Sequence, residues 1–358
     1  MRSEAPTLVV EAGDAFADTV STEVAPELVA KRGTVIVEAF NRIGVAAYTP
    51  GERDLSAGLD QLKAWAGGAK FPFVAANLVD RDGKSIFAPS VVLPVGELEV
   101  GVVGLVGQRL GLAPDVLGAN GFAVLDPVAA ARQAVAKLSA EGVDLVVALT
   151  HLDPGEEEAV QAAAPAIALV VGSHAGRMLH VPRPLNPGLA ERAAVAVDAG
   201  SRGKYLGRLD LYLPRTAKRP LLLANLNQAG ELRGQVLALR REVARAEENI
   251  KKAKTEPASS EAQRARRLQG LQASLERNRR TLEDRRAELA RVPAPDPSYA
   301  WFKNELVPVS VSLIAAPEIS ASVQAFLGQS ATTSAAATAR PTAAPAAAGR
   351  PSSPAPAR

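Results

Sequence analysis

Residues 143–176, VDLVVALTHLDPGEEEAVQAAAPAIALVVGSHAG, contain two short apolar runs, and each run ends at a polar turn that carries a histidine. Aliphatic runs of this length bounded by turn residues predict buried strands over 143–149 and 166–171. The Ala-, Glu- and Gln-rich segment between them predicts a helix, so the stretch forms a strand–helix–strand unit. Ligands of open α/β sheets bind at the carboxyl ends of the strands, where His151 and His174 both fall. The chain has three histidines in all, so the placement of these two is its main functional indication.

The chain before and after this unit alternates in the same way. Asp126-Pro127 predicts the start of a helix that runs to about residue 140, because proline fits the first helical position. Apolar runs predict further strands over 7–11, 44–48, 98–106, 193–199 and 205–213, of which the last two are expected to close the sheet. Alternating strands and helices favour an α/β layered domain over residues 1–224.

Composition narrows the class of protein. The 358 residues are enough for one large domain or two smaller ones, and 47% hydrophobic with 22% charged residues is ordinary for a globular protein. The chain has no cysteine, which excludes disulfides, thiolate metal sites and cysteine nucleophiles. No apolar run approaches the length of a membrane span, and the first residues, MRSEAPTLVVEAGD, lack the basic-then-apolar pattern of a signal peptide.

Residues 225–292 follow a different pattern. Apolar residues recur every three or four positions, pause at 254–257 and resume, as Leu232, Val236, Leu239, Val243 and Ile250, then Leu268, Leu271, Leu275, Leu282 and Leu289. This spacing, with flanks rich in Arg, Glu and Lys, predicts two helices that fold back as an antiparallel coiled-coil hairpin. Acidic residues are interleaved with the basic ones and the net charge of the chain is only +3, so we interpret the charges as a solvated face and expect no nucleic-acid partner.

The C-terminal part divides at about residue 329. Residues 293–328 predict a short ordered segment with an aromatic pair, Trp301-Phe302, followed by a strand-like run over 306–314. The pair suits either stacking on a nucleobase or an apolar anchor against the main domain, and we favour the anchor. Residues 329–358 are mostly Ala, Pro, Thr and Ser, which bury too little surface to offset ordering entropy, so a disordered tail is expected.

Four side chains with metal-binding chemistry follow predicted strands: Asp14, Glu52, His151 and His174. Imidazoles and carboxylates gathered at strand ends are typical of a divalent metal site. The residues alone leave a second interpretation open. In that interpretation Gly13-Asp14 is a turn, Glu52 is a solvated loop charge, and each histidine caps a helix.

The order of the motifs resembles the calcineurin-like metallophosphoesterases, specifically their bacterial 5′-nucleotidase branch. The motifs are Gly-Asp at 13–14, Gly-x-x-Asp at 51–54, Leu-Thr-His-Leu at 149–152 and Val-Gly-x-His at 171–174. Three connecting stretches resemble the branch as well: FPFVAANLVDRDG at 71–83, IFAPSVVLPVGELEVGVVGLVG at 86–107 and DAGSRGKYLGRLDLYL at 198–213. The resemblance covers residues 7–215. It implies a β-sandwich flanked by helices, with hydrolysis of phosphate esters by two metal ions that activate a water. Family members are mostly periplasmic.

Position by position, the resemblance assigns Asp14, Glu52, His151 and His174 to one of the two metal sites. Glu52 stands where the family has a metal-binding asparagine. The family's first motif, Asp-x-His, precedes the Gly-Asp motif, so a start upstream of Met1 would restore it. In the sequence as given, the other site keeps only the bridging aspartate, so we expect one divalent ion, Zn, Mn or Fe, rather than two.

The resemblance also marks candidate catalytic residues, Arg53 and Asp54. Arg53 replaces the family's catalytic histidine, and Gly176 replaces a second histidine of the last motif. An arginine can stabilise a leaving oxygen electrostatically but cannot donate a proton at neutral pH.

Two hypotheses follow. The first is a metal-dependent phosphoesterase of the 5′-nucleotidase type, acting on nucleotide or other phosphate monoesters with an altered, single-metal site. The alternative is a non-catalytic protein of the same fold that binds or scaffolds, by self-association or through a protein partner, with the hairpin over 228–292.

Overall fold

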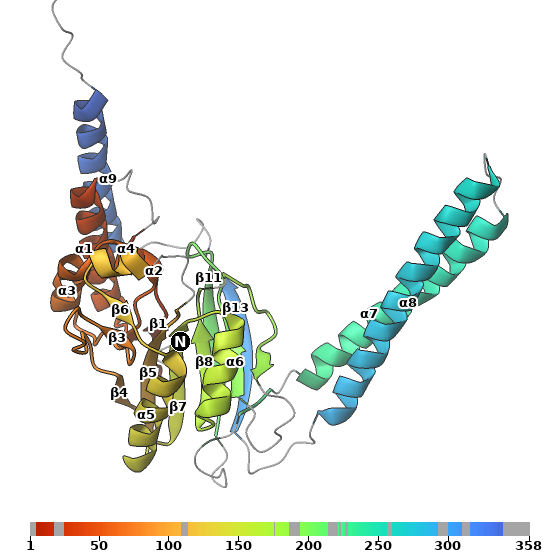
Figure 1. The fold of residues 1–358 in the computed structure, drawn as a ribbon, viewed down its shortest axis with the longest axis horizontal. Helices are drawn as coiled ribbons and strands as arrows, with labels where there is room; N and C mark the ends of the chain where they lie inside the picture. The colour runs from red at the N-terminus through yellow and green to blue at the C-terminus, as the bar shows by residue number, and fades with distance from the viewer. Residues whose placement is uncertain are drawn as a thin grey trace, which may run out of the picture.

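Two facing sheets with their helices form the main body of the molecule, and a pair of long helices extends away from it (Figure 1). The structure is a computed structural model. It describes residues 5–17, 25–108, 114–174, 176–185, 194–213, 221, 223–225, 228–255, 260–292, 300–309 and 316–338.

The larger sheet has six strands in the order β4-β5-β7-β8-β10-β9. Strands β5, β7, β8 and β10 run parallel, and β4 and β9 are antiparallel edges. The predicted strand–helix–strand unit is β7-α6-β8, at the centre of this sheet. The bounds are β4 Ser90–Val95, β5 Leu98–Val106, β7 Leu145–His151, β8 Ile167–Gly172, β9 Arg183–Leu185 and β10 Ala194–Val197.

Helices α5 (Pro127–Ala140) and α6 (Pro154–Ala163) cover one face of the six-stranded sheet. Each begins with a proline after an aspartate whose carboxylate accepts backbone N–H groups of the first turn, which satisfies donors that a helix start leaves unpaired. Alternate residues of β7 point to opposite faces of the sheet. Val146 and Ala148 pack toward the helices, while Leu145, Val147 and Leu149 pack toward the second sheet. Burial on both faces explains why the sequence shows a continuous apolar run here.

The second sheet has the order β11-β13-β12, with bounds β11 Tyr205–Tyr212, β12 Leu223–Asn225 and β13 Ala300–Pro308. The expectation that 205–213 closes the first sheet is therefore wrong. Strand β11 pairs along its whole length with β13, which comes from the segment 293–328. Phe302 is fully buried between the two sheets, so the interpretation of this residue as an apolar anchor is confirmed.

The N-terminal part packs around an aromatic cluster. Phe16, which follows β1 (Val10–Glu11), has its ring centroid 4.6 Å from that of Tyr48, which ends β2 (Ala47–Tyr48). Trp65 and Phe73 complete the contact, at 5.2 and 5.8 Å from Phe16. The cluster fixes the loop after β1 against the end of β2. The other elements here are α1 Pro26–Ile43, α2 Glu52–Ser56, α3 Leu59–Gly68, β3 Leu78–Val79, α4 Pro114–Ala119 and β6 Ala123–Val124.

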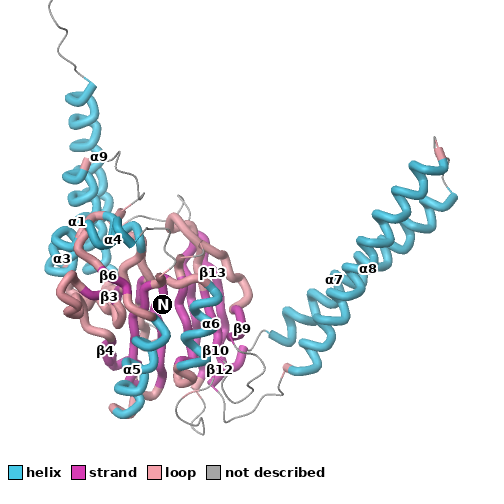
Figure 2. Tube along the Cα trace, in the orientation of Figure 1, coloured by secondary structure: helices cyan, strands magenta, loops and turns pink. Residues whose placement is uncertain are grey.

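Helices α7 (Gln228–Thr255) and α8 (Glu261–Arg291) lie side by side as a hairpin between β12 and β13 (Figures 1 and 2). At 1.5 Å per residue they are about 42 and 46 Å long. Leu275 and Leu282 of α8 are buried in the seam, and Arg279 bonds Glu247 across it at 2.7 Å. Residues 256–257 of the predicted break lie outside the described residues.

Helix α9 (Pro317–Thr338) packs beside α1. It continues past residue 329, where the sequence predicted the disordered tail to begin, because alanine-rich stretches such as 335–337 favour helix. Residues 339–358 of that tail lie outside the described residues. Within the described parts of the chain, none of the helices has both the length and the apolar character needed to cross a membrane.

Candidate metal centre

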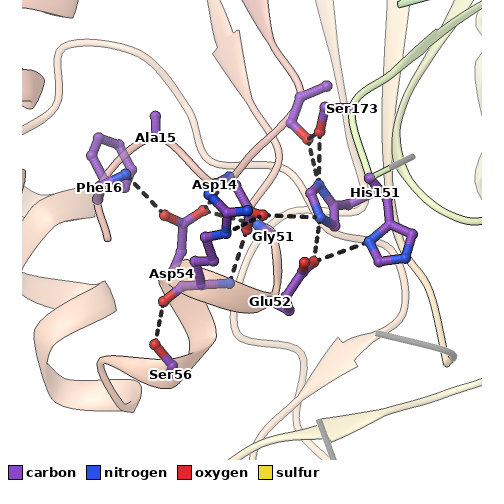
Figure 3. A network of polar contacts seen from close by, with 12 residues as sticks. Asp14, Ala15, Phe16, Gly51, Glu52, Asp54, Ser56, His151 and Ser173 are labelled. Carbon is purple, nitrogen blue, oxygen red and sulfur yellow. Dashed lines mark hydrogen bonds and ion pairs between the residues drawn. The ribbon is translucent and has the colours of Figure 1, made fainter. Parts of the chain in front are cut away.

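The carboxyl ends of β1, β2, β7 and β8 meet at one place, and His151 lies at its centre (Figure 3). His151 is the last residue of β7 and is fully buried. Its Nδ1 lies 3.1 Å from the carbonyl oxygen of Ala12 and 2.8 Å from the Ser173 hydroxyl. Its Nε2 contacts Glu52 Oε2 and lies 3.5 Å from Asp14 Oδ2. One ring nitrogen thus faces backbone and hydroxyl, and the other faces two carboxylates.

Asp14 occupies the loop after β1 with φ +63°, a left-handed conformation that aspartate tolerates better than most residues. The loop passes very close to the loop that carries Gly51. A Cβ atom on Gly51 would lie 2.2 Å from Asp14 Oδ1, and one on Gly13 would lie 2.7 Å from the Gly51 nitrogen. The glycines of both motifs are therefore required by this close approach.

Helix α2 presents two further groups at its first turn. Glu52 Oε2 contacts both histidines, with His174 Nδ1 at 3.2 Å. The Arg53 backbone N–H donates to Asp14 Oδ1 at 2.8 Å, and its Nε lies 3.4 Å from Asp14 Oδ2. The contact with Asp14 orients the Arg53 guanidinium. The side chain is 39% exposed, so solvent can reach it.

The four predicted metal-binding residues are brought together. One ligand atom each from Glu52, His151 and His174 lies within 4.8 Å of the others, and Asp14 lies beside this group through its contact with His151. Two imidazoles with carboxylates are donors that suit Zn, Mn or Fe. His174, Asp14 and Glu52 keep 22%, 15% and 12% exposure of their side chains, so the group is open on one side.

Asp54 does not face this opening. Its buried carboxylate accepts four hydrogen bonds, from the backbone N–H groups of Asp14, Phe16 and Gly51 and from the Tyr48 hydroxyl. Those bonds tie the two loops together and leave the carboxylate no free direction toward a substrate. These contacts do not fit the prediction that Asp54 is catalytic. They indicate that its carboxylate positions the two loops.

Burial and the charges of neighbouring groups shift the pKa values of the site residues in opposite directions. Burial raises the pKa of Asp14 to about 6, although the attraction of His151 opposes this. Burial would lower the pKa of His151, but the hydrogen bond to Glu52 and the charge of Asp14 raise it to about 9. For Glu52, burial alone would raise the pKa, but hydrogen bonds from His151 and His174 hold that pKa well below its usual value. The carboxylates of Glu52 and Asp14 thus favour the protonated form of His151.

Sequence reasoning missed Ser173 and Tyr48. Ser173 is the variable position of the last motif, and Tyr48 lies three residues before Gly51. Nothing in the sequence indicates that Ser173 contacts the ring of His151 or that Tyr48 donates a hydrogen bond to Asp54. The remaining histidine, His180, is exposed, and its ring lies 6.3 Å from that of Tyr205, away from the site.

Comparison with known proteins finds relatives, although no protein-family model matches the chain. It is 28% identical over 205 residues to an apyrase of Aedes aegypti, covering 51% of this chain and 36% of the relative. It is 25% identical over 228 residues to a human 5′-nucleotidase, covering 59% and 38%. It is 28% identical over 208 residues to the trifunctional nucleotide phosphoesterase protein YfkN of Bacillus subtilis, covering 50% and 14%.

A crystal structure of the calcineurin-like phosphoesterase YfkN aligns with a TM-score of 0.47 at 25% identity, over 59% of this chain and 72% of that one. The chain spans well under half the length of the curated relatives named above. The sequence matches extend over 50–59% of this chain. The sequence matches thus relate the chain to 5′-nucleotidases, an apyrase and a nucleotide phosphoesterase.

Proposed function

We propose that this chain is a metal-dependent phosphoesterase of the 5′-nucleotidase type, which hydrolyses nucleotide or other phosphate monoesters at a single-metal site. One observation carries the proposal. In a chain related to nucleotidases, Glu52, His151 and His174 direct ligand atoms to one point, with the Asp14 carboxylate alongside.

The donor set supports one ion rather than two. Glu52, His151 and His174 would hold it, with Asp14 as the fourth ligand. When bound, a Zn, Mn or Fe ion at such a site polarises a phosphoryl oxygen and makes a bound water more acidic. Asp14 also contacts Arg53, so a fixed positive charge already lies beside the carboxylate that a second ion would share.

Arg53 is proposed to bind the ester. Its guanidinium is permanently charged and presents several N–H donors, which suits the oxygens of a phosphate monoester. Contact with Asp14 orients the side chain, and partial exposure leaves it accessible to substrate. Since arginine does not release a proton at neutral pH, its proposed contribution is electrostatic, toward the charge that develops on the leaving oxygen.

Metal content tests the site. We expect about one transition metal per purified chain by elemental analysis, lost in the Asp14→Ala/His174→Ala double variant and kept in His180→Ala, which removes the exposed histidine away from the site. Wild-type protein should release phosphate from adenosine 5′-monophosphate or p-nitrophenyl phosphate, and a chelator should abolish the release. Arg53→Gln should lower kcat/KM while keeping the metal. Protein that carries metal but hydrolyses no phosphate ester under these conditions would overturn the proposed activity.

The long hairpin favours a second candidate, a non-catalytic scaffold of the same fold. It projects from the body (Figure 1). Most of its described side chains are exposed to solvent. Self-association is the simplest form of this function. Sedimentation of the full chain at several concentrations tests it, and a protein that stays monomeric throughout the range would argue against self-association.

A further inference from the structure

We propose that Ser173 is a positioning residue that fixes which ring nitrogen His151 turns toward the metal site. This inference rests on the proposed metal centre. The observation behind it is a closed triangle of polar atoms on the side of His151 away from the carboxylates (Figure 3).

The three atoms of this triangle are the Ser173 hydroxyl, His151 Nδ1 and the carbonyl oxygen of Ala12. The hydroxyl oxygen lies 2.6 Å from the Ala12 carbonyl oxygen and 2.8 Å from Nδ1, and Nδ1 lies 3.1 Å from the same carbonyl oxygen. A carbonyl oxygen only accepts hydrogen bonds, and a hydroxyl group has one hydrogen to donate.

These properties leave one consistent arrangement. The Ser173 hydroxyl donates to Ala12 and accepts from an Nδ1–H of His151. In the reverse arrangement, with Ser173 donating to a bare Nδ1, the Ala12 carbonyl oxygen would face two lone pairs at close range. Nδ1 therefore carries a hydrogen, and in the neutral ring Nε2 is left with its lone pair directed at Glu52 and Asp14.

The position of Ser173 in the chain makes it suited to this task. It stands between the last residue of β8 and His174, and its backbone N–H donates to the carbonyl oxygen of Thr150 at 3.3 Å. The one hydroxyl thus links the ends of β1, β7 and β8, which carry Asp14, His151 and His174. Partners of this kind set the orientation of metal-binding imidazoles, and their loss typically weakens metal affinity by about 10- to 100-fold.

The test uses the full chain and Zn²⁺. We expect Ser173→Ala to bind Zn²⁺ about 10- to 100-fold more weakly in a chelator competition. Ser173→Thr, which keeps a hydroxyl, should restore the affinity to near that of the wild type. Ser139→Ala, an exposed serine on α5, is the matched control and should bind as the wild type does. A merely structural role would lower thermal stability and leave the affinity of the folded protein unchanged.

A second measurement reads the protonation of the ring directly in the wild type. The ¹⁵N spectrum of histidine-labelled, Zn²⁺-loaded wild type should show His151 with a protonated Nδ1, assigned by loss of the signal in His151→Gln. An unprotonated Nδ1, or Ser173→Ala with wild-type affinity, would overturn the proposal. Wild type that binds no Zn²⁺ would overturn it together with the metal centre. Wild type that binds Zn²⁺ but releases no phosphate would overturn only the proposed activity.

Discussion

At the scale of single residues, the site depends on His151, a fully buried ring between an uncharged side and a carboxylate side. Burial without a partner would cost the imidazolium several kcal/mol, so the charged form persists only because Glu52 and Asp14 face it. A divalent cation at the same place would take over the role of the proton. Metal binding and protonation of His151 are therefore competing events.

This competition predicts how pH changes the stability of the metal-free protein. The pKa of His151 is raised from 6.5 to about 9, so its contribution is fully present below pH 6.5 and is lost as pH rises through 9. This difference in pKa corresponds to roughly 3 kcal/mol of stability. Asp14, whose pKa burial raises to about 6, acts in the same direction at lower pH.

Urea unfolding in the presence of a chelator, from pH 6 to 9.5, measures this effect. The midpoint of the wild type should fall with rising pH, and His151→Gln should flatten the curve between pH 6.5 and 9. His180→Gln, at the exposed histidine, should follow the wild type. Identical slopes for the wild type and His151→Gln would contradict the assignment of the charge to His151.

The four ligand candidates could be predicted from sequence because each follows a strand, and strand ends of parallel neighbours meet. The roles of Asp54 and Ser173 could not. Both depend on hydrogen bonds between distant loops: Asp54 to the backbone of residues 38 and 40 positions away, and Ser173 to Ala12, 161 positions away. A carboxylate inside a motif can face substrate or backbone, and only the folded chain shows which.

At the scale of elements, the ends of helices and strands could be predicted where the local sequence pattern was strong. Strand β5 and helix α5 begin and end as predicted, because an unbroken apolar run and an Asp-Pro start define them. The sheet to which β11 belongs could not be predicted, since its partner β13 pairs Leu211 with Phe302, far along the chain. Helices α2 and α3 are separate elements, because Gly58 between them adopts φ +86°.

Strand β13 should therefore be as important to stability as any strand of the first sheet. Phe302 is fully buried against residues of both sheets, so Phe302→Ala should cost about 3–5 kcal/mol in the free energy of unfolding. Lys303→Ala, on the exposed face of the same strand, is the control and should cost less than about 0.5 kcal/mol. Denaturant titration measures both. A loss below 1 kcal/mol for Phe302→Ala would mean that this strand is not part of the common core.

At the scale of the whole molecule, the hairpin is an insertion between neighbouring parallel strands. Leu223 of β12 pairs with Ala300 of β13, so the chain leaves the sheet and returns to it within the width of two strands. The base of the hairpin is thus fixed in the main body. None of the site contacts described above involves a residue of its two long helices. This arrangement separates the two proposed functions in space: the metal centre belongs to the strand ends, and any docking role belongs to the hairpin.

Excision of the hairpin tests this separation. Since the two strand ends are close, a flexible Gly/Ser linker of about eight residues, which spans roughly 16 Å, can replace residues 226–299. We expect the shortened protein to unfold cooperatively, to bind Zn²⁺ as the full chain does and to keep any phosphate release, because no ligand candidate lies in the removed segment. The control inserts the same linker at 256–259 and leaves both helices in place. If the full chain self-associates, the control should do so as well and the shortened chain should not. Loss of Zn²⁺ binding on excision alone would show that the hairpin supports the site, and the two functions would then have to be treated as one.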